Sequence, residues 1–145
     1  LKTAALLHDI GKIGIADTVL LKPAGLEPQE RQQVRTHAEK GAELLRHLQF
    51  LGSCLEGVRH HHERWDGKGY PEGLSGERIP LMARIIALAD SYDAMTTHRI
   101  YRAPSPPEEA LEEIRRCAGQ QFDPRLAEVF CSLLETEEAP VPQGA

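Results

Sequence analysis

The side chains most able to do chemistry in this 145-residue sequence are histidines and aspartates that stand next to one another. His8 and Asp9 are adjacent in "HDIGK", and three consecutive histidines occur in "RHHHERWDGKGYP". Mixed imidazole and carboxylate donors suit iron, manganese or zinc, and more than four donors indicate two ions bridged by a carboxylate. The candidate donors are His8, Asp9, His37, His60, His61, His62, Asp90 and Asp93.

Each of these residues also has an ordinary structural interpretation. An inward histidine is more often a hydrogen-bonded core residue than a ligand, and a buried aspartate can belong to an ion pair. Three histidines in a row can form a solvated helix end. Together, however, these interpretations require several buried polar groups to be satisfied separately, each at a cost in free energy. One divalent-metal site would satisfy all of them, so the pattern favours that site.

The first elements that must position these donors are predicted to be helical. Residues 4–7 are typical of the end of a helix that Gly11 stops, which would let the adjacent side chains of His8 and Asp9 converge. Residues 30–48 form one predicted helix with apolar residues at three- and four-residue steps. His37 falls on its inward stripe, and small Ala38 leaves room beside it. That stripe consists of Val34, His37, Gly41, Leu44, Leu45 and Leu48.

The remaining pattern is also helical. A helix is expected from Ser53, its candidate N-cap, to about Arg64, with the three histidines at its end. Residues 66–80 are rich in Gly and Pro and must form a loop. Residues 81–97 carry apolar side chains on nearly every face, so this helix should be buried. An amphipathic helix over 108–117 and a last helix capped by Asp123 complete an all-α prediction.

Bulk composition excludes several classes of function. The net charge of −5 argues against a general nucleic-acid-binding surface, so no DNA partner is expected, although a small phosphorylated ligand needs only local cations. The cysteines Cys54, Cys117 and Cys131 lack zinc-type spacing and are expected to be reduced and structural, as in a cytoplasmic protein. No apolar run approaches the roughly 20 residues of a membrane span.

Three stretches closely resemble the HD-GYP domain, a bacterial branch of the HD phosphohydrolase superfamily: "LLHDIGKIGI", "HHERWDGKGYP" and "ARIIALADSYDAMTTHRIYR". They occur in the family's order and spacing, and the resemblance runs from about Leu1 to Ala127. Members of this kind are helical, metal-dependent phosphodiesterases that hydrolyse cyclic di-GMP. The resemblance implies an HD-domain helical bundle over residues 1–135, followed by a disordered tail over residues 136–145.

The resemblance also implies which residues bind metal. Asp9 would bridge two divalent ions, iron or manganese by preference, with zinc, nickel or magnesium as substitutes. His60 precedes the motif and is expected to end its helix rather than bind metal. Glu63 and Asp93 are expected beside the ligands, Asp93 orienting an arginine or a histidine. The implied ligands are His8, Asp9, His37, His61, His62 and Asp90.

Basic side chains and the loop that carries Tyr70 are expected to contact the substrate. Lys12 could neutralise phosphate in the transition state, and the family pattern also places this lysine at the site beside catalytic Asp9. Arg99 and Arg102 are candidates for phosphate or guanine contacts, the alternative being a solvated helix end. The segment Gly69, Tyr70 and Pro71 matches a loop near the substrate mouth that is also implicated in partner binding.

Three functions follow as hypotheses. The first is hydrolysis of cyclic di-GMP to linear pGpG, and onward to GMP, in bacterial second-messenger signalling. The second is hydrolysis of another cyclic dinucleotide. The third is a catalytically weak metal-binding module that docks to a diguanylate cyclase (GGDEF) domain through the loop at residues 69–71.

The chain begins almost on the HD pair, whereas complete HD-GYP domains have further helices before it. We therefore expect an N-terminally truncated domain with a sensor or receiver domain upstream. The apolar segment at residues 1–7 would then need cover, either from a homodimer or from residues outside this sequence.

Overall fold

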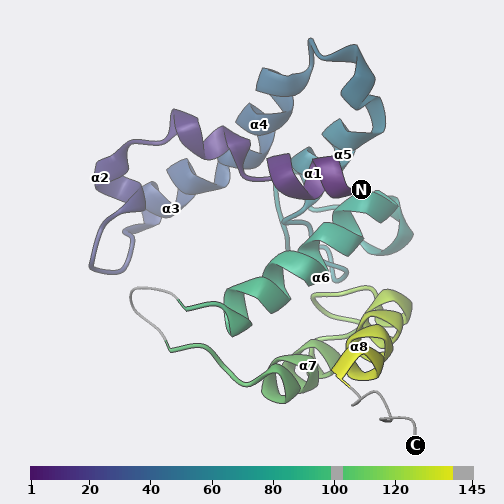
Figure 1. The fold of residues 1–145 in the computed structure, drawn as a ribbon. Helices are drawn as coiled ribbons and strands as arrows, with labels where there is room; N and C mark the ends of the chain where they lie inside the picture. Colours follow the sequence, from purple (N-terminus) through teal and green to yellow (C-terminus); the bar gives the residue numbers. More distant parts are fainter. Residues whose placement is uncertain (99–102, 139–145) are drawn as a thin grey trace, which may run out of the picture.

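The computed structural model describes residues 1–98 and 103–138, which form helices and short 3-10 turns without a named strand (Figure 1). The predicted all-α class is confirmed. The helices are α1 (Lys2–Leu7), α2 (Asp17–Leu20), α3 (Pro28–Arg35), α4 (His37–Leu45), α5 (Gly52–His60), α6 (Leu81–Thr96), α7 (Pro107–Arg116) and α8 (Pro124–Glu138). The 3-10 turns are η1 (Ile10–Gly14), η2 (Gln49–Leu51) and η3 (Gly76–Arg78).

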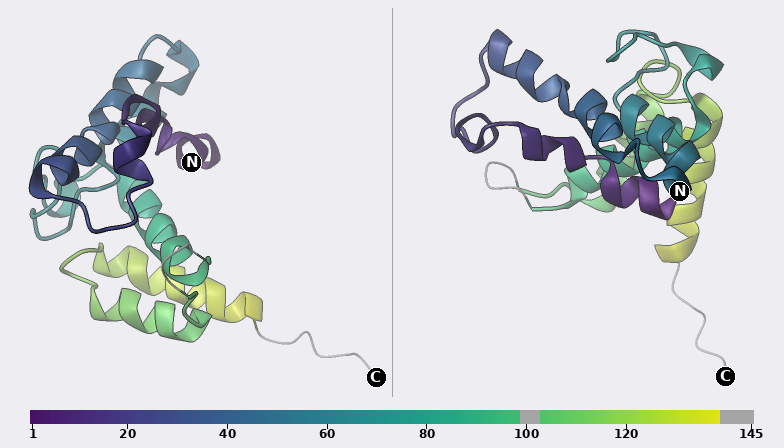
Figure 2. Two further views of the ribbon diagram at one scale, coloured as in Figure 1. Left: turned by 90° about the vertical axis from the view of Figure 1, so that its left-hand side faces the viewer. Right: turned by 90° about the horizontal axis from the view of Figure 1, so that it is seen from above.

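Helix α6 lies between two groups of helices, and each group has its own apolar cluster (Figures 1 and 2). Leu88 of α6 packs with residues of α7 and α8 on one side, around Leu111 and Ile114. On the other side, Leu45, Leu51 and Val58 join α4, η2 and α5, and α5 also packs against α6. The long helix thus connects the two halves of the fold, as its nearly all-round apolar pattern requires.

The helix predicted over residues 30–48 is divided at Thr36 into α3 and α4. The Thr36 hydroxyl donates a hydrogen bond to the Gln33 carbonyl, which competes with the regular helical ladder. The predicted inward stripe is partly wrong, because Leu44 and Leu48 are 54% and 41% exposed. The buried face of α4 is turned toward η1 and α5 instead, and it consists of His37, Ala38, Gly41, Ala42 and Leu45.

Two further predictions about helix ends need correction. Helix α5 begins at Gly52 after Leu51, so Ser53 is not its N-cap, and it ends at His60 rather than near Arg64. At the other end of the chain the prediction holds, since the Asp123 carboxylate accepts hydrogen bonds from the backbone amides of Arg125 and Leu126 at the start of α8.

Helix α8 extends to Glu138 and therefore includes the first three residues of the expected tail, whereas residues 139–145 lie outside the described residues.

The cysteines and the helix lengths also bear on the predictions. All three cysteines are free, as predicted. In the part of the chain that the structure describes, every helix is too short or too polar to cross a bilayer.

Candidate metal centre

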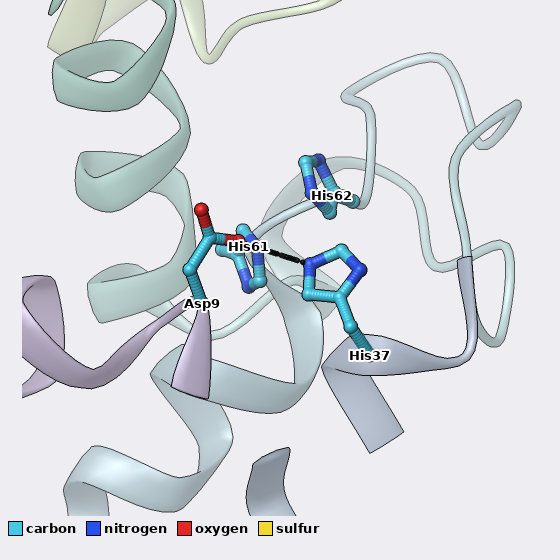
Figure 3. A group of neighbouring side chains, drawn as sticks. All are labelled: Asp9, His37, His61 and His62. Carbon is cyan, nitrogen blue, oxygen red and sulfur yellow. Dashed lines mark hydrogen bonds and ion pairs between the residues drawn. The ribbon is translucent and has the colours of Figure 1, made fainter. Parts of the chain in front are cut away.

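Four donor side chains from separate parts of the chain meet at one point between α4, α5 and α6 (Figure 3). Asp9 precedes η1, His37 begins α4, His61 directly follows α5, and His62 comes next. One ligand atom from each lies within 4.8 Å of the others. Because α5 ends at His60, His61 and His62 leave the helix and can both turn toward this point.

Gly11 lets the HD segment lie against the helix that carries His37. A Cβ atom at Gly11 would stand 1.9 Å from the carbonyl oxygen of His37 and 2.5 Å from the amide nitrogen of Gly41. The sequence analysis expected Gly11 to stop a helix. Helix α1 has already ended at Leu7, however, so glycine is required by the close approach of two backbones rather than by helix termination.

Three of the histidine rings are fixed in the same way. The Nδ1 atoms of His8, His37 and His61 each lie 2.6–2.7 Å from the backbone carbonyl three residues earlier. A carbonyl oxygen only accepts hydrogen bonds, so each Nδ1 must carry the proton. The lone pair of every neutral ring therefore sits on Nε2, the atom that faces the site. Metal-binding histidines are oriented by this same kind of outer hydrogen bond.

The Nε2 atoms lack the hydrogen-bond donors that would satisfy them. Those of His37 and His61 are 3.3 Å apart, although each carries a lone pair when its ring is neutral. The buried Nε2 atom of His8 has no hydrogen-bond partner within the described residues, with Asp9 and Asp90 oxygens 3.5 and 3.6 Å away. A cation satisfies such convergent lone pairs and carboxylates together, so the donor set fits a divalent metal ion.

The electrostatics favour the protonation states that bind metal. Burial lowers the pKa of His61 to about 4 and that of His62 to about 3, which keeps both rings neutral near neutral pH. Burial alone would raise the pKa of Asp9, but its contacts with His37 and Lys12 outweigh burial and lower it. For His8 the direction is the opposite, because the neighbouring Asp90 raises its pKa.

Four of the six predicted ligands thus bring a ligand atom to one point, and the other two, His8 and Asp90, lie beside them. The His8 ring lies edge-on to His61 with ring centroids 5.0 Å apart, and Asp90 reaches His8 from the side of α6. Contact with His8 lowers the pKa of Asp90, which keeps this second carboxylate ionised. An oxygen of Asp9 and an oxygen of Asp90 thus both lie within 3.6 Å of His8 Nε2.

Lys12 and Tyr70 border the cluster. The Lys12 ammonium donates a hydrogen bond to Asp9 Oδ2 at 2.5 Å, one turn along η1. The Tyr70 ring stacks on the His62 ring, with centroids 4.8 Å apart and planes 28° apart. Burial raises the pKa of Tyr70 to about 12, so its hydroxyl stays protonated.

Glu63 holds the loop that presents Tyr70. Its fully buried carboxylate accepts hydrogen bonds from the backbone amides of Glu72 and Leu74, at 2.7 and 3.0 Å. The sequence analysis expected Glu63 beside the metal ligands; the structure shows it bonded to this loop.

Gly69 brings the same loop close to the histidine segment. A Cβ atom at Gly69 would stand 2.4 Å from the Arg64 amide nitrogen, so only glycine allows the return. The loop is closed at this point by a hydrogen bond from the Tyr70 amide to the His62 carbonyl. The Tyr70–Pro71 peptide bond is cis.

The other predicted site residues that the structure describes are not part of the donor cluster. His60 is buried away from the cluster, near Glu56 and Glu63, which agrees with its expected role as a helix-end residue. Asp93 is exposed, and its carboxylate accepts a hydrogen bond from the Thr97 hydroxyl. Arg99 and Arg102 lie outside the described residues.

A cavity of about 200 Å³ opens beside the cluster and shows residues that the sequence analysis missed. His61, His62 and Asp90 line it, together with Arg35, Lys68 and Ser91. The available sequence signal for Arg35 was its position two residues before the lone His37.

Comparisons with known proteins identify the family to which the chain belongs. Residues 1–126 match the HD-domain family. The chain is 46% identical over 132 residues to a cyclic di-GMP phosphodiesterase of Thermotoga maritima, which covers 90% of this chain and 36% of that protein. It is 40% identical over 132 residues to 3′3′-cGAMP-specific phosphodiesterase 2 of Vibrio cholerae, covering 90% of this chain and 25% of that protein.

A solved structure shows the same fold. The crystal structure of a cyclic GMP-AMP-specific phosphodiesterase of Vibrio cholerae superposes with a TM-score of 0.67 and 29% identity, covering 92% of this chain and 37% of that one. The chain thus spans about a third of the length of the relatives it matches.

Proposed function

The chain belongs to the HD-domain family, and on that premise we propose that it is a metal-dependent phosphodiesterase that hydrolyses cyclic di-GMP to linear pGpG. The observation that carries the proposal is the convergence of Asp9 with the Nε2 atoms of His37 and His61, whose Nδ1 atoms contact backbone carbonyls. Relatives at 46% and 47% identity are named a cyclic di-GMP phosphodiesterase and a probable one, which supports this choice of substrate.

The six clustered side chains would hold two divalent ions, iron or manganese by preference, with zinc, nickel or magnesium as substitutes. Asp9 is the proposed bridging carboxylate, because its two oxygens face His37 on one side and His8 and Lys12 on the other. When bound, the ions would supply Lewis-acid chemistry, lowering the pKa of water and polarising a phosphate oxygen. The proposed ligands are His8, Asp9, His37, His61, His62 and Asp90.

The chain's own cations and rings would position the substrate. The Lys12 ammonium stands at Asp9, so a phosphate bound there would meet it, and a fixed cation stabilises charge that develops in the transition state. The Tyr70 ring would contact a nucleotide from the mouth of the site, because it lines the cavity with one face against His62. Arg99 and Arg102 remain proposed contacts for phosphate or guanine.

A second candidate substrate is 3′3′-cGAMP. The relative at 40% identity and the superposed crystal structure are both named for cyclic GMP-AMP hydrolysis. Both substrates contain guanine and two phosphates, so the proposed metal cluster would serve either reaction. The choice between them would be made by side chains that contact the second base.

A direct test combines metal analysis with turnover. The chain is purified without oxygen, loaded with ferrous iron or manganese, and analysed for bound metal by mass spectrometry. Linear product from cyclic di-GMP and from 3′3′-cGAMP is then measured by chromatography. About two ions per chain and pGpG formation are expected. A protein that binds metal but turns over neither nucleotide would instead fit the metal-binding module.

The loop Gly69, Tyr70 and Pro71 is also the proposed docking site for a diguanylate cyclase domain. Its outer face is accessible, since a second cavity of about 260 Å³ lies along these residues and Arg35. A cytoplasmic location, a homodimer and an upstream sensor or receiver domain complete the proposed setting.

A further inference from the structure

Arg35 stands at the mouth of the metal centre on top of a stack of two rings. Its guanidinium carbon lies 5.1 Å from the centroid of the Tyr70 ring, and the other partner of that ring is His62. Arg35 also lines both the cavity beside the metal ligands and the cavity along the outer face of the loop. The Tyr70 ring thus contacts both Arg35 and the candidate ligand His62.

Arg35 differs from the other arginine that lines the inner cavity. Arg64 is occupied, because it donates two hydrogen bonds to Asp66 at 2.9 and 3.1 Å and a third to Gln121. The Arg35 side chain makes no hydrogen bond or ion pair with any residue within 1–98 and 103–138. It lies over the face of the Tyr70 ring. Its N–H donors are thus available to a ligand.

The ring contact separates Arg35 from an ordinary solvated arginine. A guanidinium over an aromatic face is attracted to it and loses part of its side-chain freedom before any ligand arrives. Its planar array of donors matches phosphate oxygens. Lys68 lines the same cavity and is exposed, as Arg35 is, but among the described residues no aromatic ring lies beneath Lys68.

We propose that Arg35 binds the phosphate of the cyclic dinucleotide that is not being hydrolysed. This inference rests on the proposed function, which places one phosphate at Asp9 and the histidines. A cyclic dinucleotide carries a second phosphate across its ring, and this phosphate must lie away from the metal ligands. Arg35 is the cation at the rim that is both free and held in place.

The test compares three substitutions at Arg35 with a matched control. Arg35→Gln removes the charge, Arg35→Lys keeps it, and Arg35→Met removes it while keeping a long chain that can pack on Tyr70. Arg31→Gln removes the same charge one helical turn earlier on α3, outside the lining of either cavity. The measurements are KM and kcat with the metal-loaded protein, and the Kd of a slowly hydrolysed phosphorothioate analogue of cyclic di-GMP.

Arg35→Gln and Arg35→Met are expected to raise KM and Kd about tenfold, equivalent to about 1.4 kcal/mol, with kcat much less affected. Arg35→Lys should retain most of the affinity, and Arg31→Gln should match the unaltered chain. Normal binding by Arg35→Met would overturn the inference in favour of simple packing on Tyr70, and so would equal effects of Arg35→Gln and Arg31→Gln. If the unaltered chain neither binds nor hydrolyses a cyclic dinucleotide, the proposed function fails first and the inference with it.

Discussion

The Nε2 atoms of His37 and His61 face each other across 3.3 Å, while the opposite nitrogen of each ring is fixed on a backbone carbonyl. Neither ring can rotate away without losing its carbonyl contact. When both rings are neutral, their two Nε2 lone pairs are therefore held against each other. Asp9 adds a carboxylate oxygen 3.3 Å from His37 Nε2. This arrangement is costly without a positive charge between the donors and favourable with one.

Replacing Asp9 by Asn removes the carboxylate that lies among the histidines. Bound metal should fall and hydrolysis should cease, while the helical content measured by circular dichroism stays constant. Asp17→Asn, on the exposed side of α2, serves as the control and should keep its metal. Full activity in Asp9→Asn would eliminate the two-ion mechanism.

Replacing Lys12 by Ala separates catalysis from metal binding. A protonated ammonium cannot bind a metal ion, so both ions should remain. The turnover number should fall by a factor of about 10²–10³. Losses of this size are typical when an enzyme loses one hydrogen-bond donor that stabilises charge developing in the transition state. Iron or manganese titration followed by product chromatography tests this, with Lys2→Ala as a control. Normal turnover would reduce Lys12 to a partner that only neutralises Asp9.

Tyr70 offers a graded pair of substitutions. Tyr70→Phe keeps the ring on His62 and the surface beneath Arg35, so its KM should stay close to that of the unaltered chain. Tyr70→Ala removes the ring and should raise KM about tenfold, with metal content unchanged. Steady-state kinetics and metal analysis of the two variants provide the comparison. Equal KM values would show that the ring does not contact substrate.

Glu63→Gln tests whether this carboxylate holds the loop. An amide offers one acceptor oxygen, so one of the amides of Glu72 and Leu74 would lose its partner, at a cost of about 1–3 kcal/mol. Hydrogen exchange at these two amides should accelerate, and urea denaturation should show the lower stability. Glu77→Gln, at an exposed position of η3, is the control. Unchanged exchange would mean that other contacts hold the loop.

Gly11→Ala tests the close approach of η1 and α4. The new methyl group would meet the His37 carbonyl, which forces the two backbones apart and should destabilise the protein by about 1–3 kcal/mol or more. Metal content should fall with it, because Asp9 and His37 move apart. Gly25→Ala adds its methyl group in open space and should be tolerated. Thermal denaturation of both variants is the measurement.

The sequence allowed the site to be predicted more closely than the helices that carry it. Asp9, His37, His61 and His62 bring ligand atoms within 4.8 Å of one another, and His8 and Asp90 lie beside them. Five of these six residues could be recognised because "HDIGK", the lone His37 and the paired His61 and His62 are short, chemically distinctive stretches. Helix ends were harder to place. The break at Thr36 depends on a hydroxyl competing for a backbone carbonyl, and the end of α5 depends on how its last turn packs. The spacing of hydrophobic residues reveals neither of these effects.

The roles of Gly11, Glu63 and Arg35 were missed or misassigned for a different reason. Each depends on a partner far away in the sequence or at the end of another element: the His37 backbone, the loop amides of Glu72 and Leu74, and the Tyr70 ring. Composition and spacing describe a residue's neighbours along the chain. They do not show which backbone or ring is brought next to it by folding.

The carbonyl contacts of His8, His37 and His61 have a consequence for metal exchange. Each ring has already lost much of its rotational entropy when the chain folds, so an arriving ion has little left to immobilise. The helices around the site carry their own apolar clusters, and the fold does not depend on an ion in the way that a zinc finger does. Such a protein can release one metal and accept another without refolding. Since iron, manganese and zinc all accept imidazole and carboxylate donors, the supply in the cell would decide which of them occupied the proposed site.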